Sequence, residues 1–203
     1  FDELRADWPL LLKRSAARFS IGDDMSHAFG ERYGHEFEAF ANCIDPADWP
    51  KPRMRPPGEF RVRYAGSLAK NMALDSVRLV ADAIEQLADS GENITFEIKT
   101  RPMWRGVAEE DCKGHNNTRV ITDDLSIEDY RNWVADADVT LIAYNFDPES
   151  LSYVQYSLAN KLPDCLASGT VVLAVGPAAH ATLKTLRRDD CGLCVNDPDI
   201  DKV

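Results

Sequence analysis

The chain has 203 residues, of which 44% are hydrophobic, and its formal net charge is −11. This length suits one packed domain together with a fragment of a second one. The acidic balance disfavours nucleic acid and anionic membrane surfaces as partners of this region, because both attract clustered Lys and Arg. No apolar run approaches the roughly 18 residues of a membrane-crossing helix.

The N-terminal part of the chain predicts two helices and two short strands. Apolar residues at helical spacing indicate a helix over residues 2–18, then a strand at 18–21, a second helix at 23–32 and a strand at 37–41. Residues 49–58 contain four prolines, which exclude a helix and disfavour a central strand. We therefore expect a domain boundary at this proline-rich segment.

Past Gly58 the pattern alternates between β-branched runs and amphipathic stretches. Strands are expected at residues 61–65, 94–99, 119–122, 139–143, 171–175 and 192–195, and helices at 76–89, after the capping residue Ser126, at 157–168 and at 178–188. Residues 101–117 read as irregular. Such alternation predicts an α/β fold with a doubly wound, parallel sheet of the Rossmann-like type.

In a doubly wound sheet, ligands bind beyond the carboxyl ends of the strands. The loops at Gly66, Thr100, Asp123, Tyr144 and Gly176 each follow a predicted strand, so we expect them to share one rim. Asp136-Ala137-Asp138 has the letters of a metal-binding DxD motif, but it precedes a strand and belongs at the opposite edge.

Two segments near that rim carry polar side chains suited to an anion. Gly66-Ser67 ends the first predicted strand, where a glycine allows close approach of a phosphate, and Lys70 follows. Asn160 and Lys161 open the helix after the fourth strand, and Asp164 lies one turn further on the same side. These six residues are the candidate ligand-binding residues.

The segment Ser157–Gly169 and the strand after it resemble the donor-binding helix of GT-B glycosyltransferases, especially family 4, where an "NKL-E-(aromatic)-L-A-(small)-G-x-P-V" pattern is common. The segments at 60–68 and 133–142 resemble, in the right order, the phosphate loop and a core strand of the same C-terminal domain. Residues 19–25 and 41–45 are similar to the last strand and exit linker of the preceding domain.

The resemblance implies roles for particular residues. Gly66, Ser67, Lys70 and Lys161 would contact the diphosphate of a nucleotide-sugar, Asn160 would contact the same donor, and Asp164 would hold the ribose hydroxyls. Four neighbours are weaker candidates for the same donor: Tyr144, Asn145, Tyr156 and Ser157. The chain departs from the family at Asp164, where Glu is usual, at Cys165, usually aromatic, and at Val171, usually Pro.

A further departure concerns the acidic pair of the family. Many members carry a second acidic residue before the ribose-binding one, near the transferred sugar, but this chain has Tyr156 there, with Asp147 and Glu149 out of register. Catalytic residues therefore stay unassigned.

The resemblance divides the chain into a remnant of an N-terminal acceptor domain (1–48), a linker (49–58) and a nucleotide-sugar-binding C-terminal domain (59–203). It implies transfer of a sugar to an acceptor hydroxyl, with a glycan or lipid-linked acceptor bound through an N-terminal domain of which this chain, beginning at Phe1, carries only a part. The expected partner is a UDP-, GDP- or similar nucleotide-sugar, and we expect no cofactor.

We expect no metal either, because the four histidines form no HxxxH or HxE pair. The five cysteines are odd in number and no secretory signal is recognisable, so we expect reduced thiols in a cytoplasmic protein, or one held peripherally at a membrane in its full-length form.

Two alternatives stay open at this point. A nucleotide-sugar epimerase of the same fold would use acidic and His residues in the cleft, for which the sequence offers no match. A non-enzymatic, receiver-like or scaffolding α/β domain would need an acidic pair after the first strand, where this chain has Ala65-Gly66.

Overall fold

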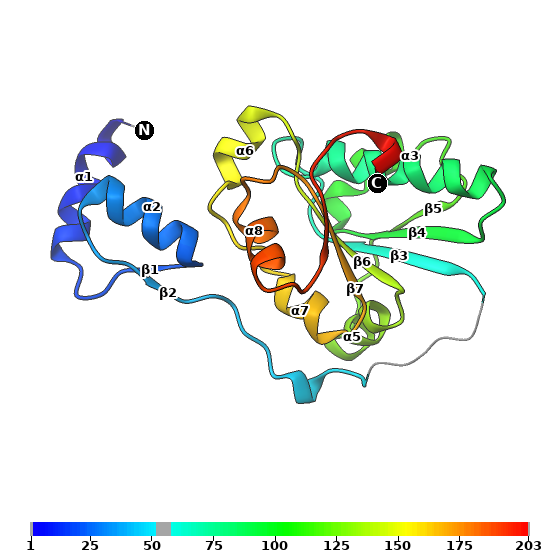
Figure 1. Ribbon diagram of the computed structural model, residues 1–203, viewed down its shortest axis with the longest axis horizontal. Coiled ribbons are helices and arrows are strands. Elements are labelled where there is room, and N and C mark those ends of the chain that lie inside the picture. Colours follow the sequence, from blue (N-terminus) through cyan, green and yellow to red (C-terminus); the bar gives the residue numbers. More distant parts are fainter. Residues whose placement is uncertain (1, 52–57, 203) are drawn as a thin grey trace.

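The structure is a computed structural model that describes residues 2–51 and 58–202 (Figure 1). Within them, a six-stranded sheet forms from strands β3 to β8, and a separate pair, β1 and β2, lies in the N-terminal segment. The strands are β1 (Phe19–Ser20), β2 (Glu38–Ala39), β3 (Phe60–Ala65), β4 (Ile94–Lys99), β5 (Thr118–Ile121), β6 (Val139–Ala143), β7 (Val171–Val175) and β8 (Leu193–Val195).

The helices alternate with these strands. They are α1 (Asp2–Arg14), α2 (Asp23–Tyr33), α3 (Leu74–Asp89), α4 (Arg105–Asp111), α5 (Ile127–Ala135), α6 (Pro148–Val154), α7 (Leu162–Ala167) and α8 (Ala181–Arg188), with short 3₁₀ turns η1 (Pro46–Asp48), η2 (Pro102–Trp104) and η3 (Ile200–Lys202).

All pairings in the large sheet are parallel, and its strand order is β5-β4-β3-β6-β7-β8. This confirms the predicted parallel, doubly wound sheet with the first strand inside it. The order corresponds to 3-2-1-4-5-6 of dinucleotide-binding folds and not to the 2-1-3-4-5 order of receiver domains. The receiver-like alternative is therefore excluded for the described sheet.

Each face of the sheet carries its own hydrophobic cluster, as alternation along a strand requires. On one face Val62, Tyr64, Phe96 and Ile98 pack against α3. On the other face the side chains of β6 and β7 pack against α6, α7 and α8. Helices thus cover both faces of the sheet. The ends of the strands stay uncovered by these helices, and the loops at the carboxyl ends can form a ligand-binding site.

The N-terminal segment contacts the larger sheet domain at several points. Asp24 at the start of α2 forms an ion pair of 2.8 Å with Lys184 of α8. Further along, Trp49 is buried and the guanidinium of Arg131 on α5 lies 5.9 Å from the centroid of its ring. The predicted linker 49–58 continues from this anchor, but its residues 52–57 lie outside the described residues.

Two sequence predictions in the N-terminal 117 residues were wrong in detail. The first predicted helix ends at Arg14 instead of residue 18. Residues 101–117 are not irregular, because η2 and α4 occur there. Helix α4 has only seven residues, too few for a periodic pattern, and it is stabilised by packing: Ala108 is fully buried and Val107 lies against the core.

The helix predicted within 157–168 is present, but it starts later than Ser157: α7 begins at Leu162, with Lys161 as its N-cap. Residues 157–161 form a turn in which the Ala159 N–H donates to the Thr182 hydroxyl of α8 at 2.9 Å. Helix α6 was missed, although Asp147 caps it by accepting from the Ser150 N–H at 2.8 Å and Pro148 occupies its first turn.

Candidate donor site

Strands β3 and β6 are neighbours in the sheet although two other strands, β4 and β5, lie between them in the chain, and the strand order reverses between them. Ligands of doubly wound sheets bind at this kind of switch point, beyond the carboxyl ends of the strands. Gly66 directly follows β3 and Tyr144 directly follows β6. Two hollows meet at this place, and both include Ala65, Gly66 and Ser67 in their walls.

The first hollow, here called the Lys161 pocket, has a volume of about 660 Å³ and lies between β3, β6, α6 and the turn before α7. Its polar lining groups include Ser67, Ser157, Asn160 and Lys161. Its remaining wall is mostly apolar and aromatic: Ile21, Tyr64, Ala65, Gly66, Met72, Ala73, Ile142, Ala143, Tyr144, Tyr153, Val154, Leu158 and Ala159. The pocket therefore offers one cation in an apolar setting.

Lys161 and Gly66 lie in direct proximity within this pocket. A Cβ added to Gly66 would overlap the Lys161 ammonium and would lie 2.7 Å from the Tyr64 hydroxyl. The Lys161 Nζ lies 3.9 Å from the centroid of the Tyr64 ring. Burial lowers the pKa of Lys161 to about 8, because the charged form loses its hydration, while the nearby Cys165 thiol acts in the opposite direction.

The second hollow, here called the Tyr130 pocket, has a volume of about 610 Å³ and lies on the other side of Gly66, between the ends of β3 and β4 and the start of α5. Thr100, Trp104 and Tyr130 are among its lining residues. The Tyr130 hydroxyl lies 3.3 Å from a carboxylate oxygen of Asp164 and donates to it. Burial raises the pKa of Asp164, and the hydrogen bond from Tyr130 partly offsets that rise.

The predicted site residues therefore separate into two groups. Ser67, Ser157, Asn160, Lys161 and Gly66 come together in the Lys161 pocket. Asp164 lines neither hollow, and its carboxylate accepts a hydrogen bond from Tyr130, which lines the second one. Sequence reasoning missed both Tyr64 and Tyr130, because a tyrosine on a core strand and one on an amphipathic helix look like ordinary packing residues.

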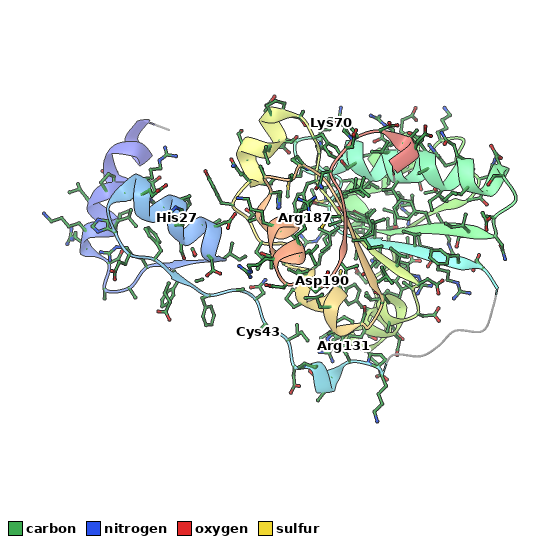
Figure 2. All side chains as sticks on the ribbon, viewed as in Figure 1. His27, Cys43, Lys70, Arg131, Arg187 and Asp190 are labelled. Atoms are coloured by element: carbon green, nitrogen blue, oxygen red, sulfur yellow. The ribbon has the colours of Figure 1, made fainter. Side chains whose placement is uncertain are left out.

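Three further candidates lie away from both hollows. Lys70 is exposed and Tyr156 is 38% exposed, and neither side chain lines a hollow described above (Figure 2 labels Lys70). The Asn145 amide is buried and holds the start of α3: its oxygen accepts from the Asp75 N–H at 3.0 Å, and its nitrogen donates to the Lys70 carbonyl at 2.6 Å. Asn145 thus fixes the loop after β6.

Tyr144, the fourth weaker candidate, lines the Lys161 pocket, and its ring stacks on His180 with 3.5 Å between centroids. His180 is fully buried, and its Nδ1 accepts from the Thr182 N–H at 3.1 Å, which caps α8. Burial lowers the pKa of His180 to about 4, and the nearby Lys184 adds to this effect. The imidazole is therefore neutral in the folded protein at neutral pH.

His180 should make the stability of the protein fall with acidification. The unfolded state binds a proton at this side chain below about pH 6.5, whereas the folded state does so only near pH 4. The free energy of unfolding should consequently decrease between these values, by about 3 kcal/mol from this group alone. Urea denaturation followed by circular dichroism across pH 7 to 4 measures the loss.

The matched variant is His180→Asn, which retains an oxygen able to cap α8 and does not titrate. Its stability should fall less steeply over the same pH interval, whereas the exposed His27→Asn should behave like the parent. Parallel pH profiles for the parent and His180→Asn would show that another group causes the acid sensitivity.

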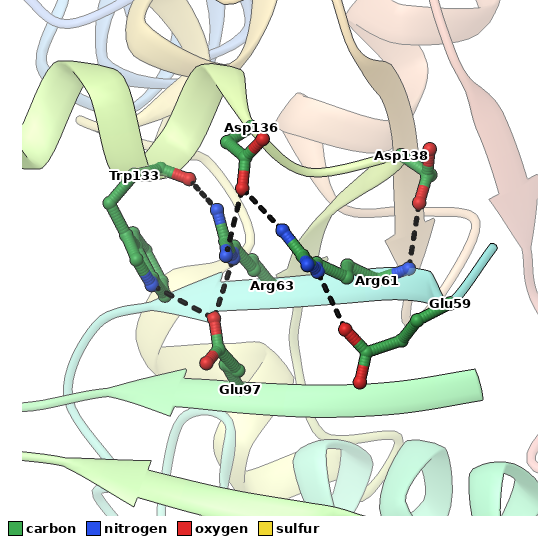
Figure 3. A network of polar contacts seen from close by, with 7 residues as sticks. All are labelled: Glu59, Arg61, Arg63, Glu97, Trp133, Asp136 and Asp138. Carbon is green, nitrogen blue, oxygen red and sulfur yellow. Dashed lines mark hydrogen bonds and ion pairs between the residues drawn. The ribbon is translucent and has the colours of Figure 1, made fainter. Parts of the chain in front are cut away.

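At the amino ends of the strands, opposite the rim, both carboxylates of the DxD segment have partners within the protein. Asp138 accepts from the Arg61 N–H at 2.7 Å, and Asp136 pairs with the Arg61 guanidinium at 2.5 Å (Figure 3). The DxD letters thus belong to a structural network at the amino ends of the strands. Within the described residues, no group of three or more His, Cys, Asp or Glu side chains could hold a metal ion.

No protein-family model and no curated protein matches the sequence. Solved structures do match: WaaG, a glycosyltransferase involved in lipopolysaccharide biosynthesis, superposes with a TM-score of 0.63 at 14% identity over 90% of this chain and 50% of its own. A glycosyltransferase from Rickettsia africae gives 0.67 at 10% identity over 100% and 55%. Both have the GT-B fold.

This chain has the fold of a GT-B glycosyltransferase C-terminal domain. A trehalose-6-phosphate protein from E. coli bound with UDP-2-fluoro glucose is similar as well, with a TM-score of 0.60 at 12% identity over 82% of this chain and 42% of that one. The chain spans about half the length of these GT-B structures or less. In the part that the structure describes, no helix combines the length and hydropathy that a bilayer crossing requires.

Proposed function

We propose that this chain binds the nucleotide-sugar donor of a glycosyltransferase that transfers a sugar to an acceptor hydroxyl. The observation that carries the proposal is the convergence of Gly66 and Lys161 at the switch point between β3 and β6. A diphosphate there would meet the Lys161 ammonium beside the backbone of Gly66, in a pocket whose apolar walls strengthen the attraction between charges. The similar E. coli structure is bound with a UDP-sugar, which supports the same ligand class.

The division of the molecule follows from this proposal. Residues 59–203 would bind the donor, residues 49–58 would act as the linker, and residues 1–48 would belong to an acceptor domain. The acceptor would be a glycan or a lipid-linked sugar, and the protein would be cytoplasmic or held peripherally at a membrane. The diphosphate charge would be balanced by Lys161 and backbone N–H groups, so the proposal requires no metal or cofactor.

The epimerase alternative has no supporting observation. Such an enzyme would use acidic and His side chains in the cleft, yet among the described residues no Asp, Glu or His lines the Lys161 pocket. His180 lies behind Tyr144 and is fully buried. Glycosyl transfer is therefore the function that the site supports best.

Calorimetric titration with UDP, GDP and ADP tests the proposal. We expect one of the three to bind, while the chain alone transfers no sugar from the matching nucleotide-sugar, because it spans only about half the length of the similar enzymes. Failure of all three nucleotides to bind would refute donor binding. Transfer by the 203 residues alone would refute the assignment of the acceptor site to a separate domain.

A further inference from the structure

Tyr64 contacts both Lys161 and the loop at Gly66 in the Lys161 pocket, although it belongs to a core strand. Its side chain is 2% exposed and lies under the loop that follows β3. Its hydroxyl donates to the Ser67 carbonyl at 2.8 Å, and its ring lies 3.9 Å from the Lys161 Nζ. One aromatic side chain thus joins the loop at Gly66 to the cation that arrives from the start of α7.

The ring takes the place that a carboxylate normally has beside a buried ammonium. In the part of the chain that the structure describes, no acidic residue lines the Lys161 pocket. The face of an aromatic ring attracts a cation through its quadrupole but carries no net charge. Lys161 is therefore held in place while its positive charge stays available to an incoming anion, whereas a carboxylate would compete for it.

At Gly66 the Lys161 ammonium and the Tyr64 side chain fill the space that a side chain would need. A Cβ there would lie 2.7 Å from the Tyr64 hydroxyl and would overlap the Lys161 Nζ. Gly66, the Tyr64 ring and the Lys161 ammonium are therefore in mutual contact, and the absence of a side chain at Gly66 leaves room for the ammonium. The hydrogen bond from the Tyr64 hydroxyl to Ser67 fixes the loop beside them.

We propose that Tyr64 is a positioning residue, which holds the Lys161 ammonium against Gly66 so that it meets the diphosphate of the donor. This inference rests on the proposed donor binding and extends it to a side chain of the core strand β3. It separates two roles within one residue: the ring positions Lys161, and the hydroxyl positions the loop at Ser67.

The test compares Tyr64→Phe, which keeps the ring, with Tyr64→Leu, which removes it at similar apolar character. The probes are inorganic pyrophosphate, the tightest of UDP, GDP and ADP, and its nucleoside, each titrated by calorimetry. We expect Tyr64→Leu to weaken binding of pyrophosphate and of the nucleoside diphosphate by about tenfold and nucleoside binding by much less, whereas Tyr64→Phe stays within about threefold of the parent. Circular dichroism verifies that both variants fold.

A spectroscopic readout reports on Lys161 without any ligand. The Lys161 Nζ lies 3.9 Å from the centroid of the Tyr64 ring, so the NMR signal of the adjoining ε-methylene protons should be shifted upfield in the parent and in Tyr64→Phe. In Tyr64→Leu it should return to the position of exposed lysines. An unshifted Lys161 signal in the parent, or an unchanged one in Tyr64→Leu, would overturn the proposal.

The pH dependence gives an independent readout. The titratable groups near the Lys161 ammonium are Tyr64 of β3, Tyr144 directly after β6, Tyr153 of α6 and Cys165 of α7. Burial raises the pKa of Tyr64, Tyr144 and Cys165, so these three stay neutral near pH 8. In the parent, the affinity for pyrophosphate should therefore fall below its value at pH 7 as the pH rises past about 8. In Tyr64→Leu, the same fall in affinity should begin at a lower pH, because this variant loses the ring that stabilises the charged amine.

The outcomes separate this inference from the proposed function. Pyrophosphate binding that Tyr64→Leu leaves unchanged overturns the role of Tyr64 and leaves donor binding intact. Pyrophosphate binding that depends on the ring, without binding of any nucleoside diphosphate, supports the role of Tyr64 and refutes the nucleotide ligand. Failure of both kinds of probe to bind overturns both.

Discussion

Lys161→Ala should weaken binding of a nucleoside diphosphate by about 1.5–3 kcal/mol while leaving binding of the matching nucleoside almost unchanged. The reason is that Lys161 supplies the cation of its pocket, next to the backbone of Gly66. Removing the cation affects the phosphates and not the base or ribose. Calorimetric titration of parent and variant with UDP or GDP and with uridine or guanosine at pH 7 measures the difference.

Asp164→Ala provides the contrasting variant. It should weaken nucleoside and nucleoside diphosphate about equally, because the proposed partner of its carboxylate is the ribose. Since the Tyr130 hydroxyl donates to this carboxylate, Tyr130→Phe serves as the matched control: it removes the hydrogen bond and keeps the carboxylate. Equal losses of affinity in Asp164→Ala and Tyr130→Phe would assign the effect to Tyr130. If neither Lys161→Ala nor Asp164→Ala changes the affinity for a nucleotide that the parent binds, the donor-site assignment is refuted.

Arg63→Ala should lower the free energy of unfolding by about 3–5 kcal/mol, since it leaves a buried carboxylate without its cation. The Arg63 Nε lies 2.7 Å from Glu97, its guanidinium donates to the Trp133 carbonyl, and it lies 5.0 Å from the centroid of the Trp133 ring (Figure 3). The side chains of Arg63 and Glu97 are only 7% and 16% exposed. Urea denaturation at pH 7, monitored by circular dichroism, measures the loss.

The neighbouring Arg61 offers a control in the same network. It pairs with Glu59 and Asp136, but its side chain is 31% exposed, so Arg61→Ala should cost about 1 kcal/mol or less. Combining Arg63→Met with Glu97→Gln should restore part of the stability, because the amide oxygen still accepts from the Trp133 indole, 3.0 Å from Glu97 in the parent. A loss in Arg63→Ala as small as that in Arg61→Ala would show that the buried pair contributes little.

The predicted sheet matches the structure closely because its strands are buried on both faces. The bounds of β4, β6 and β7 agree with the sequence prediction residue for residue. A strand covered by helices on each side needs a short apolar run between breaking residues, and that requirement is visible in the chain itself. Short elements such as α4 lack such a pattern, since contacts with the core stabilise them.

Part of the site could be predicted in the same way. Gly66 and Lys161 were expected at one rim, and the structure brings them together, because parallel strands align their carboxyl ends. Asn145 was a donor candidate on the same grounds, yet its amide holds the first turn of α3. The sequence predicts which residues lie at the rim, but it does not predict which group a polar side chain will hydrogen-bond with there.

The sequence by itself determined the parallel α/β architecture, the rim at which a ligand would bind and the presence of a glycine and a lysine on it. Only the tertiary structure decided that Tyr64 lies beneath Lys161, that Asp164 contacts Tyr130 and that Arg63 pairs with Glu97 inside the protein. The physical reason is range. Periodicity and turn residues act over a few positions of the chain, while these three contacts join residues about 30 to 100 positions apart, and packing alone selects them.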